Sequence, residues 1–324
     1  MEFPLRRPMP MLFCLLLAFV AESVSGCLAA EPGWLLWPSP TNAVQFCLAT
    51  NAAAGAAARF NTFAIRAWGQ TLLSWPGPGV ERFAGNDDAP LAGADHVLIN
   101  GAGPVLNPNV AAPVLETASG RDWSYVALDL TPAYRDRLRL FRRSILYVEP
   151  DLFVLHDQVE ADAPVRYQMI LHPPVATVLD PDWGDLRLAT DQGGLWIHAP
   201  SSRRELRRWE RLVPGAEVKE SGVLTMGLGP TNSVTHLNVL VAFALTPPGG
   251  RPDFAFKLLE SPNAIGARIH RHGLPTLVAF RTSPGSAGAS LTGFAFQGPV
   301  GVDAFRPRRR AVSSGTPGAA SPAP

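Results

Sequence analysis

Two short apolar runs near the middle of the chain give its clearest structural pattern. Residues 145–148 and 152–155 are apolar at every position, rich in β-forming residues, and separated by a turn that contains Pro150. A run of this length with no polar side predicts a strand buried on both faces of a sheet. We therefore expect two central strands here, covered by other layers on either side.

From Val165 onward the pattern changes to strict alternation. One face of the expected strand carries Val165, Tyr167, Met169 and Leu171, and the other carries Arg166, Gln168, Ile170 and His172. Such alternation predicts a strand with a single face on the core. Pro173 and Pro174 follow and end the ladder, because proline has no N–H to donate. His172 is thus expected at the end of a strand, on its more polar face.

Similar strand-like runs recur from Phe60 onward, separated by turns. The chain has 324 residues with 29 Gly and 32 Pro, and no long segment repeats with the period of a helix. This predicts an all-β fold, a large antiparallel β-sandwich, which we place at residues 59–305. Residues 28–58 are poorly defined, and the run "NAVQFCLAT" at 42–50 fits a strand or a helical turn. Residues 306–324, basic and then rich in small residues and proline, are expected to be disordered.

The N-terminus has the features of a leader. Arg6 and Arg7 precede an apolar run at residues 11–20, and small residues follow. This predicts a signal peptide at residues 1–27, too short for a stable membrane span, and an exported protein of the periplasm, cell envelope or extracellular space. The "VSGC" tetrad at 24–27 resembles a lipobox, in which Cys27 becomes a lipid anchor. Plain cleavage near the same point is the alternative.

Composition excludes some classes of function. The formal net charge is +1 and charged residues make up 17% of the chain, so no basic field for a polyanion exists over the whole molecule, and a nucleic-acid partner is not expected. The sequence has three cysteines, and removal of the leader leaves Cys27 and Cys47 at most, so it predicts no disulfide framework. No GxSxG, HExxH or CxxC motif occurs. The "GAGP" at 101–104 and "GLGP" at 227–230 lack the Lys-Ser/Thr of a phosphate loop, and both are predicted to be turns.

An ordered series of motifs covers most of residues 59–175. In chain order they are "FNTFAIRAWGQTLLSWPGPG" from Phe60, "DHVLINGAGP" from Asp95, "YVALDLTPAY" from Tyr125, "PDLFVLHDQV" from Pro150, and an aromatic-bearing strand that closes at His172. Their order and spacing resemble the C-terminal β-sandwich of heparinase II/III-like proteins, which are polysaccharide lyases. The later half of the chain matches that family in its β-rich texture alone.

The resemblance implies β-elimination on an acidic, uronic-acid-containing polysaccharide. In such lyases an α/α toroid of helices supplies much of the catalytic cleft, and the β-sandwich adds a metal site. There is no room for a toroid between Cys27 and Phe60, so a separate partner carrying the toroid is one expectation. His172 falls on a family ligand position for a possible zinc ion. His96 would be a second ligand only with a one-residue shift of register, which turns a strand side chain to the opposite face.

The family's other ligand positions are changed, and zinc needs three or four protein ligands. A strand-end histidine bonded to the backbone is therefore the competing interpretation of His172. For substrate binding, the candidates are two aromatic residues that could stack on sugar rings, Trp68 and Trp209, and two arginines that could bind carboxylate or sulfate, Arg203 and Arg204. Ordinary core packing and a solvated hairpin or short helix are the competing interpretations.

Three further residues invite a chemical interpretation. Asp157 is expected where a strand ends, capping backbone N–H groups. Asp129 and Tyr134 fit acid–base work, since abstraction of a proton beside a carboxylate needs a base, but nothing places them in one cleft, and a packing role resembling a tyrosine corner is favoured for Tyr134. Catalytic residues therefore stay unassigned. The hypotheses are a lyase-related protein, a non-catalytic carbohydrate-binding sandwich, and an inactive remnant, and enzyme activity is left open.

Overall fold

The structure is a computed structural model, and it describes residues 34–38, 44–49, 63–68, 70–73, 96–104, 111–171, 177–180, 185–190, 193–199, 206–212, 225–230, 232–247, 255–271, 273–283 and 288–304. The predicted leader and tail lie outside these residues, as does His172. All strand pairs in the described part of the chain are antiparallel, and its helical structure is one short 3-10 turn, η3 (Thr131–Ala133). No helix there is long and apolar enough to cross a membrane.

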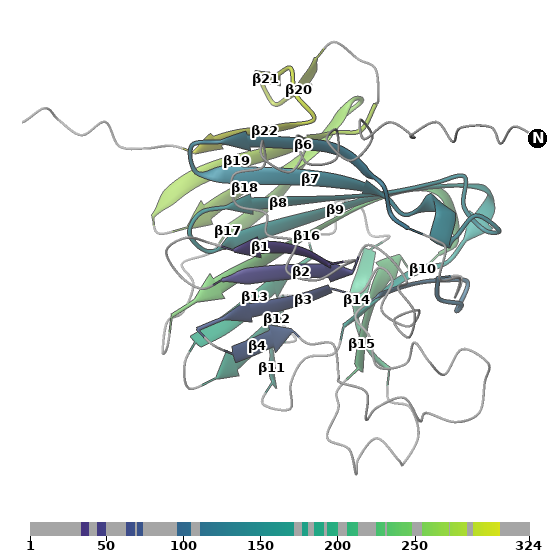
Figure 1. The fold of residues 1–324 in the computed structure, drawn as a ribbon, viewed down its shortest axis with the longest axis horizontal. Helices are drawn as coiled ribbons and strands as arrows, with labels where there is room; N and C mark the ends of the chain where they lie inside the picture. The colour runs from purple at the N-terminus through teal and green to yellow at the C-terminus, as the bar shows by residue number, and fades with distance from the viewer. Residues whose placement is uncertain are drawn as a thin grey trace, which may run out of the picture.

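An eight-stranded sheet forms the centre of the molecule (Figure 1). Its strands in spatial order are β11 (Thr177–Asp180), β12 (Asp185–Thr190), β13 (Gly193–His198), β16 (Val234–Thr246), β9 (Leu152–Val165), β8 (Leu140–Val148), β7 (Trp123–Asp129) and β6 (Val114–Gly120). The longest strands, β9 and β16, lie side by side in the middle, and their pairing extends from Leu152 opposite Ala244 to Val165 opposite Val234.

Three smaller sheets and a hairpin complete the fold. The first contains β1 (Trp34–Pro38), β2 (Gln45–Ala49), β3 (Phe63–Ala67) and β4 (Gln70–Leu73). The second has the order β14 (Leu206–Leu212), β15 (Thr225–Pro230), β10 (Tyr167–Leu171) and β5 (His96–Ile99). The third contains β17 (Ala255–Ser261), β18 (Ala264–Arg271), β19 (Leu274–Arg281) and β22 (Val300–Ala304), and the hairpin is β20 (Ala289–Leu291) with β21 (Phe294–Phe296).

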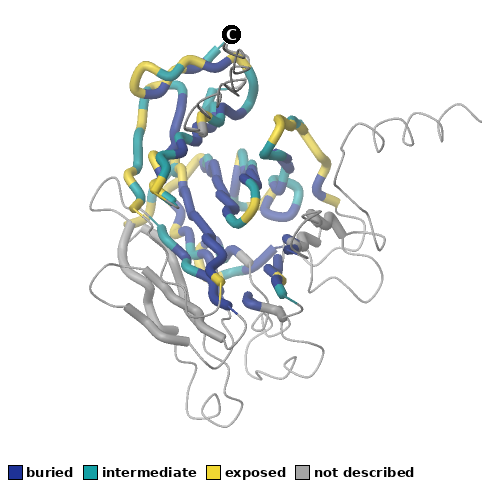
Figure 2. Tube along the Cα trace, turned by 90° about the vertical axis from the view of Figure 1, so that its left-hand side faces the viewer, coloured by how far each residue is buried: buried dark blue, intermediate teal, exposed yellow. Residues whose placement is uncertain are grey.

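The central sheet is buried on both faces, as its apolar runs predict. Along β8, Ile145 and Tyr147 belong to one hydrophobic cluster, while Leu146 and Val148 belong to another. Because strand side chains alternate between the faces of a sheet, a strand covered on both sides needs apolar residues at every position. Figure 2 shows the buried residues in the middle strands and exposed positions at the outer turns.

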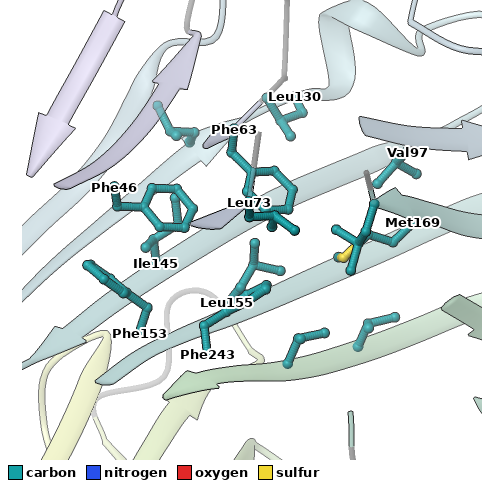
Figure 3. Close-up of a cluster of buried hydrophobic side chains, with 14 of the residues drawn as sticks. Phe46, Phe63, Leu73, Val97, Leu130, Ile145, Phe153, Leu155, Met169 and Phe243 are labelled. Carbon is teal, nitrogen blue, oxygen red and sulfur yellow. The ribbon is translucent and has the colours of Figure 1, made fainter. Parts of the chain in front are cut away.

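The larger cluster lies between the central sheet and the first two small sheets. Phe46 of β2 stacks on Phe63 of β3 with ring centroids 5.6 Å apart, and it also contacts Phe153 of the central sheet at 5.3 Å. Phe63 meets Phe243 edge to face at 6.0 Å. Figure 3 shows these rings together with Val97 of β5 and Met169 of β10. The first and second small sheets therefore share one core against a single face of the central sheet.

The third small sheet covers the opposite face. Its buried residues Ile265, Ile269, Val278 and Phe280 join a cluster with Leu146, Val154 and Leu240 of the central sheet. The result is a layered β-sandwich in which the eight-stranded sheet is the middle layer. The sequence prediction of an all-β antiparallel sandwich is confirmed.

Several local predictions can be compared with the strands. The "GAGP" segment is a turn as predicted, because Ile99 and Ala102 exchange backbone hydrogen bonds of 2.9 and 3.1 Å. The prediction of a turn at 227–230 is wrong, since these residues lie in β15. The run at 42–50 contains strand β2, which pairs with β3, so the first sheet draws on residues from both sides of the boundary at residue 58.

Candidate functional site

The second small sheet brings together residues that are far apart in the sequence. In the register of its four strands, His96 of β5 is opposite Ile170 of β10, Ile170 is opposite Gly227 of β15, and Gly227 is opposite Glu210 of β14. Directly opposed residues of antiparallel strands occupy the same face of a sheet. These four positions therefore form one row across the sheet, which we call the His96 row.

The His96 row lies on the face turned away from the core. Tyr167, Met169 and Leu171 of β10 are all fully buried in the larger hydrophobic cluster. Because neighbouring residues of a strand alternate, Gln168 and Ile170 belong to the other face, and Gln168 is half-buried. The alternation predicted from the sequence for this strand is thus confirmed, and its less buried face carries the row.

Of the two predicted zinc ligands, the structure describes His96. His96 opens β5, and its register with β10 puts it on the face of Ile170, the same face to which the sequence pattern assigns His172. His172 itself lies outside the described residues, so the pairing of the two histidines stays a prediction. Among the residues that the structure describes, no three His, Cys, Asp or Glu side chains gather as a metal site.

The predicted sugar-binding residues are distributed over two sheets. Trp209 lies in β14, at a break in register between Arg207 and Glu210, within the same sheet as His96. Trp68 lies in the turn between β3 and β4 of the first small sheet. Arg203 and Arg204 precede β14 and lie outside the described residues. Over residues 206–212 the basic run forms strand β14, which pairs antiparallel with β15, the next strand along the chain; this agrees with the predicted hairpin and not with the short helix.

Trp68 is held in an unusual conformation. It occupies a two-residue turn between Ala67 and Gln70 with φ of 53°, a region that bulky residues rarely adopt. Its indole is half-buried against the larger cluster and lies beside Gly193, the first residue of β13. A Cβ on Gly193 would come within 2.3 Å of the Trp68 ring, so this contact requires a glycine. Trp68 therefore joins the first sheet to the central sheet, which supports its packing role.

A buried ionic group links the central sheet to β10. Arg143 of β8 and Asp157 of β9 are directly opposite in register and form two hydrogen bonds, Nε to Oδ1 at 2.8 Å and Nη2 to Oδ2 at 2.7 Å. The Tyr167 hydroxyl of β10 donates to the same Oδ2 at 2.7 Å. All three residues have zero exposure. We call Arg143, Asp157 and Tyr167 the buried trio.

The trio corrects the expectation for Asp157. We expected this residue at a strand end, capping backbone groups, but β9 continues without a break from Leu152 to Val165. Asp157 instead balances a buried guanidinium, whose side chain also lies 5.6 Å from the ring centres of Phe63 and Phe141. The sequence signal was present: Arg143 alternates with the core-facing Phe141 and Ile145, so its charge requires a buried partner on a neighbouring strand.

The trio is chemically unsuited to act as a base. Burial first, and then the adjacent Asp157 carboxylate, raise the pKa of Tyr167 well above its ordinary value. Burial alone would lower the pKa of Arg143, but the same carboxylate outweighs burial and raises it. A tyrosine base requires a lowered pKa. Tyr167 and Arg143 therefore keep their protons, and the trio serves to connect strands.

Asp129 and Tyr134 have separate structural roles. The Tyr134 hydroxyl donates to the backbone oxygen of Val97 in β5 at 2.8 Å and is buried. An oxygen of Asp129 accepts from the backbone N–H of Thr131 at 2.9 Å and caps the η3 turn. The favoured interpretation of Tyr134 as a residue that ties a connection to a neighbouring strand is confirmed.

A second polar group lies on the opposite face of the central sheet. Glu116 accepts from Arg142 at 2.8 Å and lies 3.6 Å from Arg281 of the third sheet. His156 is buried nearby, where its Nε2 donates to the Asn238 side-chain oxygen at 3.0 Å. Burial lowers the pKa of His156 to about 4, so its imidazole is neutral at pH 7. Nothing in the sequence pattern indicated this group.

Comparison with known proteins places the fold. No protein-family model and no curated protein matches the sequence. Among solved structures, heparan sulfate lyase HepC from Pedobacter heparinus aligns with a TM-score of 0.60 over 81% of this chain, at 14% sequence identity. A heparinase III aligns with a TM-score of 0.56 over 78% of this chain, also at 14% identity. The chain has the fold of part of a heparinase III.

The extent of the match limits what it shows. The chain spans 44% of the length of the Pedobacter lyase and 42% of the heparinase III. At 14% identity the likeness establishes a shared fold and leaves the reaction to be tested. Within the described residues there is no α-helix, in agreement with the expected sandwich without a toroid. The sequence resemblance to heparinase II/III-like proteins is thus confirmed at the level of the fold.

Proposed function

We propose that this protein acts on an acidic, uronic-acid-containing polysaccharide of the heparan sulfate class, by the β-elimination used by polysaccharide lyases. The observation that carries the proposal is the fold shared with heparan sulfate lyase over 81% of the chain. The ordered motifs of residues 59–175 and the position of His172 in them add support from the sequence.

The chemistry of β-elimination defines what the protein must provide. A base removes the proton beside the uronate carboxylate, and a positive or hydrogen-bonding group stabilises the charge that develops. Under the proposal, Arg203 and Arg204 bind acidic groups of the polysaccharide and Trp209 contacts a sugar ring, whereas Trp68 packs between two sheets. The base is unassigned. Burial raises the pKa of both Tyr125 and Tyr167, which makes these tyrosines poor bases.

Zinc at His172 and His96 is part of the proposal. His96 lies opposite Ile170, on the face of β10 that the sequence pattern predicts for His172. This supports a common site for the two histidines. Imidazole is a good zinc ligand, but two histidines fall short of the three or four ligands that zinc requires. We therefore assign no step of the reaction to a metal.

A second candidate function is non-catalytic binding of the same polysaccharide. The chain spans less than half of the lyases whose fold it shares, and their remaining part is absent from the alignment. A binding module, or a subunit that works with a separate partner carrying a helical toroid, fits this observation. With the predicted leader and a lipid anchor at Cys27, either would act outside the cytoplasm, at the cell envelope.

The two candidates are separated by turnover. Purified protein is incubated with heparan sulfate and with a uronate-free polysaccharide, and the ultraviolet absorbance of unsaturated product and the affinity are both measured. A lyase gives product from the uronate substrate, and His172→Ala abolishes it, with His236→Ala, an exposed histidine of β16, as the matched control. Affinity without product identifies the binding module, and neither signal leaves an inactive remnant.

Metal content is measured on the same samples. Elemental analysis of wild type, His172→Ala and His96→Ala tests the zinc site directly, because removal of one ligand from a zinc site lowers occupancy sharply. About one equivalent of zinc that is lost in both variants is the expected result. Equal metal content in all three proteins would contradict the predicted ligands.

A further inference from the structure

The buried trio lies where three sheets meet. Arg143 and Asp157 belong to the central sheet, and Tyr167 belongs to β10 of the second small sheet. Phe63, whose ring centre is 5.6 Å from the Arg143 guanidinium carbon, belongs to the first small sheet. Through these three side chains, β10 makes a hydrogen-bonded contact with the central sheet.

Stability alone is a poor reason for such a group. Removing two charges from water has a cost that their attraction only partly offsets, and well-packed apolar residues in their place are often equally stable. The other core-facing residues of β10, Met169 and Leu171, are apolar. The buried polar group must therefore supply something that apolar packing does not.

That contribution is the position of β10 against the central sheet. β10 follows β9 after one residue, Arg166, and Val165 at the end of β9 is paired with Val234, so the chain itself limits slip along the strand. Apolar contacts alone set neither a fixed distance nor a fixed orientation between the two layers. The Tyr167 hydroxyl sets both, because its hydrogen bond of 2.7 Å to a fixed carboxylate oxygen depends steeply on distance and angle.

The neighbouring strand β5 is anchored in a similar way. Tyr134, from the connection between β7 and β8, donates to the oxygen of Val97 at 2.8 Å. Arg137 of the same connection donates to the backbone oxygens of Ala102 and Gly103, both at 2.7 Å, in the turn that follows β5. The strands β5 and β10 pair with Tyr167 opposite Ile99. Both strands that carry the His96–Ile170 part of the row are thus fixed to the central layer.

We propose that Tyr167, held by Arg143 and Asp157, is a positioning residue that fixes the outward face of β10 and β5 for binding of the acidic polysaccharide. The inference rests on the proposed function, because it concerns the face on which that function places His96. Tyr167 is buried beneath this face and acts through the strands, not by contact with the sugar.

The test compares two tyrosine variants. Tyr167→Phe removes the hydroxyl of the trio. Tyr125→Phe is the matched control, since Tyr125 is also buried and its hydroxyl lies 3.1 Å from Ser144 Oγ, on the opposite face of the central sheet. For each protein, heparan sulfate affinity, the midpoint of urea unfolding, and amide hydrogen exchange in β5 and β10 are measured.

The expected result is a separation between stability and binding. Tyr167→Phe loses the hydrogen bond to Asp157, and Tyr125→Phe loses the contacts of its hydroxyl with Ser144 and Arg142, so the unfolding midpoint falls in both variants. Tyr167→Phe alone weakens heparan sulfate binding, by about tenfold, and accelerates amide exchange in β5 and β10, because it loses a hydrogen bond to a charged group that holds these strands. Tyr125→Phe leaves affinity and exchange in β5 and β10 at the wild-type values.

Two outcomes overturn the inference, and they are distinct from failure of the proposed function. If wild type binds heparan sulfate and both variants bind equally well, Tyr167 does not position the face. If wild type neither binds nor cleaves the polysaccharide, the proposed function fails, and the positioning of a glycan-binding face fails with it. In that case, selective acceleration of exchange in Tyr167→Phe would show that the anchor itself exists.

Discussion

A charged residue in the core of this protein needs a partner of opposite charge. Arg143 has no exposure, and its guanidinium is held by Asp157 through two hydrogen bonds of 2.8 and 2.7 Å. Sequence alternation alone puts Arg143 and Asp157 on core-facing positions, but it does not identify them as partners. Their pairing depends on the register between β8 and β9, which forms only when the strands assemble.

Replacement of one member of the pair is expected to be severe. Arg143→Met leaves the Asp157 carboxylate buried without its cation, and we expect a loss of about 3–5 kcal/mol in the free energy of unfolding. Urea unfolding followed by tryptophan fluorescence measures it. Arg268→Met, at an exposed position of β18, is the control and should change stability by less than about 0.5 kcal/mol. A cost for Arg143→Met no greater than that of the control would contradict the buried ion pair.

His156 makes stability depend on pH. Its folded pKa of about 4 lies below the ordinary value of 6.5, because burial disfavours the imidazolium. Between these values the unfolded chain binds a proton that the folded chain does not. Stability from this group is therefore complete above pH 6.5 and falls as the pH drops toward 4, by about 1.4 kcal/mol per pH unit and about 3 kcal/mol in total.

The measurement is urea unfolding of wild type and His156→Gln between pH 4 and 7.5. Asp157 and Arg142 are the charged neighbours that influence His156, and the variant retains both. Wild type should lose stability more steeply than the variant over this range. Parallel pH profiles for the two proteins would show that His156 titrates alike in the folded and unfolded states.

At the scale of elements, turns and strands differ in how well the sequence predicts them. The turn at 101–104 was predicted from its glycines, and the structure shows positive φ where it begins, 55° at Asn100 and 81° at Gly101. The strand at Thr225–Pro230 was missed because two glycines and a proline are typical of a turn, yet β15 pairs with β10 and β14. Tertiary pairing overrides local propensity at such positions.

The turn between β3 and β4 gives a prediction for Gly193. A Cβ there would lie 2.3 Å from the Trp68 ring and 2.9 Å from the Thr246 backbone oxygen, and its φ of 148° disfavours side chains. Gly193→Ala should therefore lower the free energy of unfolding by about 2–4 kcal/mol. Gly273→Ala is the control for backbone strain, because Gly273 also has positive φ but has open space around it, and it should cost about 1–2 kcal/mol. Equal costs for both variants would show that the Trp68 contact is not tight.

For the whole molecule, the hydrophobic pattern of the sequence predicted the layers but not the strands that form each layer. The apolar runs at residues 145–148 of β8 and 152–155 of β9 predicted strands covered on both sides, and the structure has layers on both faces of the central sheet. Which strands form each layer did not follow from the pattern. The sheet that joins β5, β10, β14 and β15 combines segments over 100 residues apart in sequence, and no local signal specifies such pairing.

The candidate site was predicted less completely than the fold. His96 and Trp209 were chosen separately from the sequence, and the structure places their strands in one sheet. Trp68 lies in another sheet, and His172 is beyond the described residues. The buried trio beneath the His96 row was not recognised, because a charged side chain in a core-facing position acquires meaning only when its partner strand is known.

The proposed elimination on a uronic-acid-containing polysaccharide is tested by the masses of the products. Elimination divides the chain without adding water, so the masses of the two products sum to the mass of the substrate. We predict this result for a size-defined heparan sulfate oligosaccharide incubated with the purified protein. Products heavier by one water would indicate hydrolysis, and an unchanged oligosaccharide would show no cleavage, and either result would contradict the proposed elimination.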